Sequence, residues 1–238
     1  MPKLLISAGE KSGDQRAAAL LRELRTMVPD LEVFGMGGPE LRAAGCRTVV
    51  DASKLDVMGF SEPLKKLPEL RAALLKLVKL AEDEKPNAVV VCDYPGFNLR
   101  LAARLKEKGI RVVCYVSPQV WAWAPGRARR IARIVDRMLV LFPFEVGIYE
   151  RAGLTAEFVG HPLADELPGD YPARARELRA ELGVPDAGCL LALLPGSRPM
   201  ELKRHLAVFA SAAARVRKVI PGVFPVIAAA GGASHDEL

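Results

Sequence analysis

The chain has little of what builds metal or disulfide sites, with four cysteines and three histidines in 238 residues. No two cysteines form a CxxC pair, and the histidines form no cluster with metal-ligand spacing. Three of the cysteines lie beside strand-like apolar runs, so we interpret these thiols as reduced core groups of a cytosolic protein. The pattern argues against a zinc site, and we expect no bound metal ion.

Long apolar runs are also missing. The apolar run within residues 1–10 is too short for a signal peptide, and no other run reaches the length of a transmembrane helix. The excess of positive charge is modest, with a net charge of +6 and a pI of about 9.2. This positive charge favours an anionic ligand or surface, but it is too small to indicate nucleic-acid binding.

The chain instead alternates short apolar runs with longer amphipathic runs, which predicts βαβ units. Strands are predicted at 3–8, 32–36, 88–92, 111–116, 137–142 and 156–159, with helical patterns between them. These strands are nearly all apolar, as expected when helices cover both faces of a sheet. The predicted fold class is α/β, with a Rossmann-type, doubly wound parallel sheet followed by the start of a second α/β domain.

The amino-acid composition changes between residues 162 and 185, where proline and charged residues become frequent. We therefore predict an N-terminal domain over 1–161, a linker with a helix over 162–186, and a second unit over 187–238. The second unit holds strands at 189–194 and 223–230 around a helix at 201–219. Two strands and one helix cannot bury both faces of a parallel sheet, so we expect further βα units in the intact protein.

The segment 190–198, LLALLPGSR, is the most informative motif in the chain. An apolar strand ends in Gly196, Ser197 and Arg198, and a helix-like run follows. Free backbone N–H groups at the turn and helix start favour an anion, and a guanidinium adds a fork of donors that suits phosphate. We predict a nucleotide-type site that binds phosphate there.

The loop after the first strand, AGEKSGD, has two glycines that let a ligand approach the backbone closely. It lacks the GK[ST] ending of a phosphate loop, which argues against a nucleotide hydrolase. Its carboxylates suit sugar hydroxyls, with candidate ligands Glu10, Ser12, Gly13 and Asp14. The alternative is a glycine turn with Ser12 or Asp14 capping the helix. A second glycine cluster at 34–39, FGMGGP, follows the second strand, lacks dinucleotide spacing and predicts a tight turn.

Asp93 ends an apolar strand at the edge where open α/β sheets place their ligands. A carboxylate there, followed by a Pro-Gly turn, can deprotonate a hydroxyl nucleophile, so we take Asp93 as the candidate general base. The alternative is an Asx-turn or cap. Asn98 is a further candidate ligand, or a cap of the next helix.

The motif VSPQVWAW at 116–123 follows another strand and contains both tryptophans of the chain. Ser117, Gln119, Trp121 and Trp123 are candidate substrate contacts, with the indoles as a sugar platform or apolar wall. Core packing is the competing interpretation for the tryptophans. Five arginines follow directly, which indicates either a solvated face or attraction to phosphate or an anionic membrane: Arg127, Arg129, Arg130, Arg133 and Arg137.

Residues 58–70 mix large apolar residues with adjacent lysines and helix breakers. This composition suits an amphipathic flap on a membrane or lipid substrate, and an ordinary core helix is the alternative. The candidate membrane or acyl contacts are Phe60, Leu64, Lys65, Lys66, Leu67 and Leu70. His161, at the predicted domain border, is a candidate site or hinge residue, or a histidine satisfied by local backbone.

Eight motifs together resemble one family, the lipid-A-disaccharide synthases, in the order in which they occur: AGEKSGD, GGPEL, VMGFSEPL, DYPGFN, YVSPQVWAW, LFPFE, FVGHPL and LLPGSR. The resemblance covers essentially the whole chain. It implies a bacterial glycosyltransferase of the two-domain GT-B type. Family members continue with the rest of the nucleotide-sugar domain and a final helix.

The resemblance also implies a reaction. The family joins UDP-2,3-diacylglucosamine to 2,3-diacylglucosamine 1-phosphate, releasing UDP and forming a β-1,6-linked disaccharide of lipid A. Asp93 matches the position of the base, and Arg198 matches the arginine that offsets charge on the departing diphosphate. The resemblance further implies that the reaction needs no metal and no cofactor, with the UDP-sugar as donor substrate. It also implies a peripheral location on the inner face of the bacterial inner membrane and makes a homodimer a candidate assembly.

Two other interpretations stay open at the level of sequence. One is another GT-B enzyme, such as a UDP-N-acetylglucosamine 2-epimerase-like protein, which shares the architecture but not the lipid substrate. The other is an acceptor-binding module without activity of its own.

Overall fold

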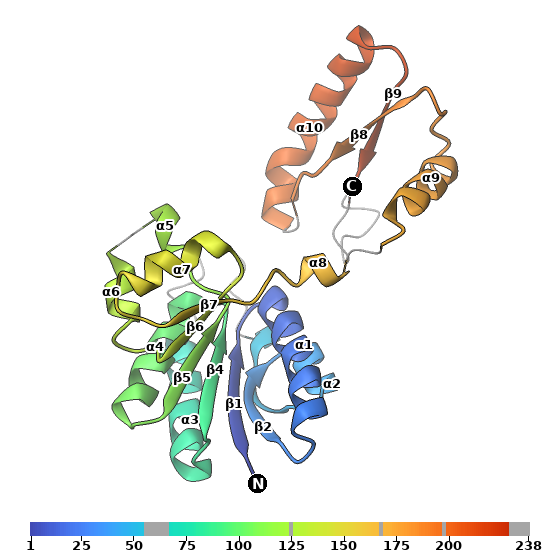
Figure 1. Cartoon of the computed structure of the whole chain (residues 1–238). Coiled ribbons are helices and arrows are strands. Elements are labelled where there is room, and N and C mark those ends of the chain that lie inside the picture. Colours follow the sequence, from blue (N-terminus) through green and yellow to red (C-terminus); the bar gives the residue numbers. More distant parts are fainter. Residues whose placement is uncertain (55–66, 124–125, 167–168, 197–198, 229–238) are drawn as a thin grey trace. The chain divides into compact units, whose positions relative to one another are not determined.

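The computed structural model describes residues 1–54, 67–123, 126–166, 169–196 and 199–228 (Figure 1). The chain divides into two compact units, Met1–Asp165 and Glu166–Leu238. The division falls inside the segment that the sequence indicates as a linker.

The described strands of the first unit form one seven-stranded sheet in the order β3-β2-β1-β4-β5-β6-β7, and each neighbouring pair is parallel. The strands are β1 (Lys3–Ala8), β2 (Glu32–Gly37), β3 (Arg47–Asp51), β4 (Ala88–Cys92), β5 (Arg111–Tyr115), β6 (Arg137–Val140) and β7 (Ala156–Phe158). Six of them lie where the apolar runs predict strands. The sequence pattern missed β3, because this edge strand buries only Val50 among its five residues.

The chain order reverses between β1 and β4, which are neighbours in the sheet although two strands separate them in sequence. Loops that leave such a pair in opposite directions open a crevice at the carboxyl ends of the strands. The loops after β1 and β4 carry the first-loop motif and Asp93, so the topology brings these two motifs together.

Helices cover both faces of the sheet. The helices described up to residue 166 are α1 (Lys11–Met27), α2 (Pro39–Ala43), α3 (Leu67–Glu84), α4 (Pro95–Glu107), α5 (Val120–Trp123), α6 (Arg127–Ile131), α7 (Pro143–Glu150) and α8 (Leu163–Glu166), with a short 3-10 turn at Ala52–Lys54. α8 buries no residue and spans the boundary between the units. Alternate residues of β1 enter different cores: Leu5 packs with α3 and α4, whereas Leu4 and Ile6 pack with α1. This period of two across a buried strand confirms the doubly wound α/β class.

The second unit contains α9 (Tyr171–Glu181), β8 (Cys189–Leu193), α10 (Pro199–Val219) and β9 (Val223–Ile227). β8 pairs with β9 in parallel, from Cys189 opposite Val223 to Leu193 opposite Ile227. The predicted strand–helix–strand order is therefore present, and α10 is the crossover between the two strands (Figure 1).

The interpretation of the three strand-associated cysteines as core residues holds for Cys92 and Cys114 and is wrong for Cys189. Cys46, Cys92 and Cys114 are buried, whereas Cys189 at the start of β8 is exposed. All four thiols are free. Burial raises the pKa of Cys46 to about 11 and that of Cys114 to about 12, and it also raises the pKa of Cys92.

We therefore expect an alkylating reagent at pH 8 to label Cys189 alone in the native chain. A thiol of pKa about 11 is only ~0.1% thiolate at that pH, and the thiolate is the reactive form. Mass spectrometry of the labelled protein should show one adduct before unfolding and four after it. Rapid native labelling in a Cys189→Ser variant would contradict the burial of the other three thiols.

Candidate active site

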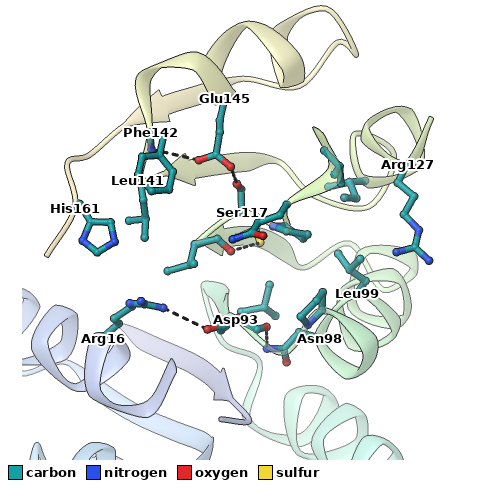
Figure 2. Close-up of a pocket in the computed structure, with 18 residues that line it drawn as sticks. Arg16, Asp93, Asn98, Leu99, Ser117, Arg127, Leu141, Phe142, Glu145 and His161 are labelled. Atoms are coloured by element: carbon teal, nitrogen blue, oxygen red, sulfur yellow. Dashed lines mark hydrogen bonds and ion pairs between the residues drawn. The ribbon is translucent and has the colours of Figure 1, made fainter. Parts of the chain in front are cut away.

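A cavity of about 460 Å³ opens at the carboxyl ends of β4, β5 and β6, wholly within the first unit (Figure 2). Several predicted site residues line it: Asp93, Asn98, Ser117, Gln119 and His161. Arg16, Arg127 and Glu145 line it as well. The structure thus gathers into one pocket residues that are up to 145 positions apart, from Arg16 to His161.

The backbone is strained in the residues that follow β4 and β5. Asp93 and Tyr94 have φ values of 55° and 48°, and Val116 after β5 has a φ of 69°. Residues other than glycine in this region cost on the order of 1–3 kcal/mol each, and they persist where the surrounding structure holds them. Such strain clusters at active sites, which favours a functional role for this end of the sheet.

Asn98 holds the strained turn in place. Its Nδ2 donates to the carbonyl oxygens of Ser7 (3.1 Å), Cys92 (3.1 Å) and Asp93 (2.7 Å), and its Oδ1 accepts from Ser7 Oγ at 2.6 Å. The side chain is buried, and these bonds occupy its polar atoms. The geometry gives Asn98 a bracing role between the ends of β1 and β4, in addition to its place in the pocket lining.

The Asp93 carboxylate is held from the first loop and from α1. Its Oδ2 accepts from Ser12 Oγ at 3.1 Å and from Arg16 Nη1 at 3.3 Å, and its Oδ1 accepts from the Tyr94 backbone N–H at 3.1 Å. The side chains of Asp93 and Arg16 are each 25% exposed, so the carboxylate remains accessible from the pocket. Sequence reasoning missed Arg16, although it lies four residues after Ser12 and so on the same face of α1.

The two glycines of the first loop are needed because this region is crowded. A Cβ at Gly9 would lie 2.1 Å from Tyr94 Cδ1, and one at Gly13 would lie 3.1 Å from Asp93 Cβ. The AGEKSGD motif therefore lets α1 begin directly against the Asp93 turn. Glu10 lies at the N-cap of α1 and outside the pocket lining.

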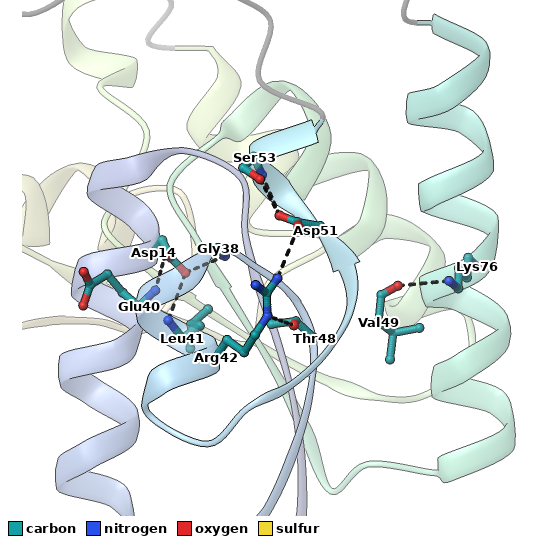
Figure 3. Close-up of polar contacts among 10 residues, drawn as sticks. All are labelled: Asp14, Gly38, Glu40, Leu41, Arg42, Thr48, Val49, Asp51, Ser53 and Lys76. Atoms are coloured by element: carbon teal, nitrogen blue, oxygen red, sulfur yellow. Dashed lines mark hydrogen bonds and ion pairs between the residues drawn. The ribbon is translucent and has the colours of Figure 1, made fainter. Parts of the chain in front are cut away.

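Asp14 lies elsewhere (Figure 3). Its Oδ1 accepts from the backbone N–H groups of Gly38 (2.7 Å) and Leu41 (3.2 Å), and its Oδ2 accepts from that of Glu40 (2.9 Å). The side chain is 3% exposed. Asp14 therefore caps the start of α2 and does not face the pocket, and it caps a different helix from the one that the sequence suggests.

This contact also explains the glycine pair at the end of β2. A Cβ at Gly38 would lie 2.6 Å from Asp14 Oδ2, and one at Gly37 would lie 3.2 Å from Oδ1. The turn interpretation of FGMGGP is thus supplemented by a close approach that requires glycine.

The opposite wall of the pocket carries a buried polar pair. Ser117 Oγ donates to Glu145 Oε1, and the Phe142 backbone N–H donates to Glu145 Oε2 at 3.2 Å. Both side chains are buried. Glu145 was not among the residues singled out from the sequence, although its place three residues after Phe142, the N-cap of α7, is a capping-box position.

An aromatic cluster begins at the pocket, where Phe142 and His161 are lining residues, and it continues to Phe144 and Trp121, which lie outside the lining. Trp121 meets Phe144 edge to face at 5.4 Å, Phe142 stacks on Phe144 at 5.7 Å, and the His161 ring lies 5.7 Å from Phe142. Trp121 is 45% exposed, so its core alternative is wrong. His161 Nδ1 accepts from the Leu163 backbone N–H at 3.2 Å, so this histidine is both a pocket residue and satisfied by local backbone.

Other predicted contacts are only partly described. Leu67 is exposed, and Leu70 is partly buried against the α3–α4 core. The side chain of Trp123 and the residues Phe60, Leu64, Lys65 and Lys66 lie outside the part of the chain that the structure describes.

The sequence comparisons identify the family. A family model described as lipid-A-disaccharide synthetase matches residues 4–235. The lipid-A-disaccharide synthase of Anaeromyxobacter dehalogenans (strain 2CP-C) is 48% identical over 219 residues, covering 92% of this chain and 56% of that protein. The synthase of Myxococcus xanthus (strain DK1622) is 43% identical over 237 residues, covering 100% of this chain and 61% of that protein. The chain belongs to the lipid-A-disaccharide synthase family.

The chain thus spans between half and two thirds of the length of these relatives. Solved structures of lower identity show that this member of the lipid-A-disaccharide synthase family shares a GT-B-like fold with them. A co-structure of S. aureus MnaA with UDP superposes with a TM-score of 0.62 at 11% identity, covering 98% of this chain and 64% of that chain. The UDP-N-acetylglucosamine 2-epimerase of Rickettsia bellii superposes with a TM-score of 0.59 at 14% identity, covering 97% and 62%.

The second unit of this family member carries the LLPGSR motif between β8 and α10. Gly196 has a φ of 133°, and a Cβ there would lie 2.4 Å from Glu201 Cβ, so the loop passes close to the first turn of α10. His205 Nδ1 lies 2.9 Å from the Pro195 carbonyl oxygen. Ser197 and Arg198 lie outside the described residues.

No group of three or more His, Cys, Asp or Glu side chains among the described residues is placed to hold a metal ion. No described helix is both long enough and apolar enough to cross a membrane.

Proposed function

We propose that this chain supplies the acceptor side and the catalytic base of a glucosaminyl transfer that forms the lipid A disaccharide. The observation that carries the proposal is the Asp93 carboxylate, held by Ser12 and Arg16 in a pocket at the carboxyl edge of the sheet. Membership of the lipid-A-disaccharide synthase family supports the choice of substrates.

In the proposed reaction Asp93 accepts the proton of the 6-hydroxyl of 2,3-diacylglucosamine 1-phosphate. The hydroxyl oxygen attacks C1 of the glucosamine in UDP-2,3-diacylglucosamine and forms the new C–O bond. The bond from C1 to the diphosphate breaks on the opposite side, UDP leaves with its electron pair, and the configuration inverts to β. Ser12 and Arg16 hold the carboxylate in line with the hydroxyl, so less entropy is lost on reaching the transition state.

The LLPGSR loop is the proposed site of the leaving diphosphate. Arg198, with the backbone N–H groups at the start of α10, would offset the charge that develops on the β-phosphate. Gly196 supports this placement, since its positive φ and its closeness to Glu201 bring the loop against the helix start. A metal ion is not required for this scheme, since a guanidinium can neutralise the diphosphate directly.

We expect Arg198→Ala to weaken UDP binding and to lower kcat, each by about 10–100-fold, because one charge-assisted fork to phosphate is lost. Arg198→Lys should restore only part of the loss, since one ammonium cannot form the bidentate contact. Titration of UDP by calorimetry and steady-state kinetics on the intact gene product measure the two effects. Unchanged affinity and turnover in Arg198→Ala would mean that the loop is only structural.

The function is tested with radiolabelled UDP-2,3-diacylglucosamine and the intact gene product, with and without the acceptor 1-phosphate. Formation of a labelled disaccharide together with UDP, only when the acceptor is present, would support the proposal. An epimerase-like enzyme would convert the donor without acceptor. A binding module would retain acylated sugar in detergent but form no disaccharide in any form of the protein.

We further propose that the protein works at the inner face of the bacterial inner membrane, where its acylated substrates would lie. The net charge of +6 and the exposed arginines of residues 127–137 support attraction to an anionic surface. Leu67, which is exposed at the start of α3, supports an apolar contact with the membrane.

A further inference from the structure

One of the two guanidinium groups that line the pocket forms no ion pair with a carboxylate of the described residues. The pocket lining contains two guanidiniums, of Arg16 and Arg127, and two carboxylates, of Asp93 and Glu145. Arg16 pairs with Asp93, and Glu145 accepts from Ser117 and from the Phe142 backbone. Within the described part of the chain, no carboxylate forms an ion pair with Arg127.

Arg127 is held on a well-anchored element. It opens α6, in which Ala128 and Ile131 are buried in the core of the first unit. Its guanidinium is exposed, and Figure 2 shows it on the opposite side of the pocket from Arg16, with Asp93 between them. A cation anchored in this way is pre-organised to meet a ligand that already touches Asp93.

The neighbourhood of Arg127 is strongly positive and uncompensated. Arg129, Arg130 and Arg133 follow within six residues and are all exposed, and no described carboxylate pairs with them. Asp136, which comes next, is engaged by Lys106 and by the Val112 backbone N–H at 2.8 Å. Clustered like charges raise the free energy of the folded chain, and an anion bound among them would lower it.

We propose that Arg127 binds the phosphate group of the acceptor sugar at the end of the pocket away from Arg16. This inference rests on the proposed function, in which the acceptor carries one phosphate and presents its hydroxyl to Asp93. A guanidinium matches a phosphate monoester with two parallel N–H···O bonds, and the remaining arginines of the segment add a positive field around that contact. The phosphate then sets the orientation of the sugar, so that the hydroxyl distant from it reaches the base.

The test compares Arg127→Gln with Arg104→Gln in the intact gene product. Arg104, on α4, is also exposed and lies outside the pocket lining, so its variant removes the same charge without touching the site. Transfer is measured in neutral detergent micelles to two acceptors, 2,3-diacylglucosamine 1-phosphate and its dephosphorylated analogue. We expect Arg127→Gln to raise KM about 10–100-fold for the phosphorylated acceptor and to leave that for the analogue unchanged. Arg127→Lys should recover part of the loss.

Three results would overturn the proposal. An equal rise in KM for both acceptors would mean that Arg127 does not bind the phosphate group. A loss that Arg104→Gln reproduces would reflect net charge alone. A loss that appears only when anionic phospholipid is added to the micelles, for both acceptors alike, would identify Arg127 as a membrane contact.

A second measurement separates this inference from the proposed function. Binding of glucosamine 1-phosphate, of glucosamine and of inorganic phosphate to this chain is followed by NMR titration. If the intact protein transfers no sugar but Arg127→Gln still weakens binding of the two phosphate probes and not that of glucosamine, the phosphate site stands without the transferase. If Arg127→Gln and the unaltered chain bind the two phosphate probes with equal affinity, Arg127 does not form the phosphate site, whether or not the enzyme transfers sugar.

Discussion

Replacing Asp93 with asparagine should lower the rate of sugar transfer by about 10²–10⁴-fold, the usual effect of losing a positioned general base. Asparagine has nearly the same shape and can still accept from Ser12, so the strained turn and the pocket should remain. Its amide cannot take the proton of a hydroxyl nucleophile. Single-turnover kinetics of the intact gene product measure the loss, and a thermal melt checks that the variant is folded.

The control for this experiment is Asp83→Asn. Asp83 is an exposed carboxylate that pairs with Lys79 on α3, and removing its charge should leave turnover within about twofold. Glu145→Gln serves as the competing assignment, because Glu145 is the other carboxylate that lines the pocket. Turnover of Asp93→Asn within a few-fold of the unaltered enzyme, with a large loss in Glu145→Gln, would move the base to Glu145.

Replacing Asp14 with alanine should destabilise the first unit by about 2–5 kcal/mol, because three backbone N–H groups at the start of α2 lose their acceptor. Two of the donors, on Gly38 and Leu41, are in buried contacts where water cannot replace the carboxylate. Urea unfolding followed by circular dichroism gives the difference in free energy of unfolding. Asp14→Asn should recover only part of it, since an amide nitrogen would face an N–H donor.

Asp30→Ala is the matched control, since Asp30 is exposed in the turn after α1 and its removal should change stability by less than about 0.5 kcal/mol. The same experiment separates the two roles considered for Asp14. An Asp14→Ala variant that is as stable as the unaltered chain but binds glucosamine 1-phosphate more weakly would make Asp14 a sugar ligand and not a helix cap.

Much of the candidate site was predictable because of where its residues stand relative to strands. Asp93, Ser117 and His161 each follow an apolar run, and the carboxyl ends of parallel strands meet at one edge of a sheet. Ser12 was predictable for the same reason. Arg16 and Glu145 were harder to find, because each lies within a helix and reaches the pocket only through its side chain.

The sequence by itself determined six of the seven strands of the first unit, the parallel α/β class, the family and the position of Asp93 at a strand end. These features follow from local periodicity and from motifs that are contiguous in the chain. Only the tertiary structure decided which carboxylate faces the pocket: Asp93 pairs with Arg16 77 residues away, whereas Asp14 turns to α2 and caps it. Such choices depend on hydrogen bonds between residues that are distant in sequence, and these form only when the sheet brings β1, β2 and β4 side by side.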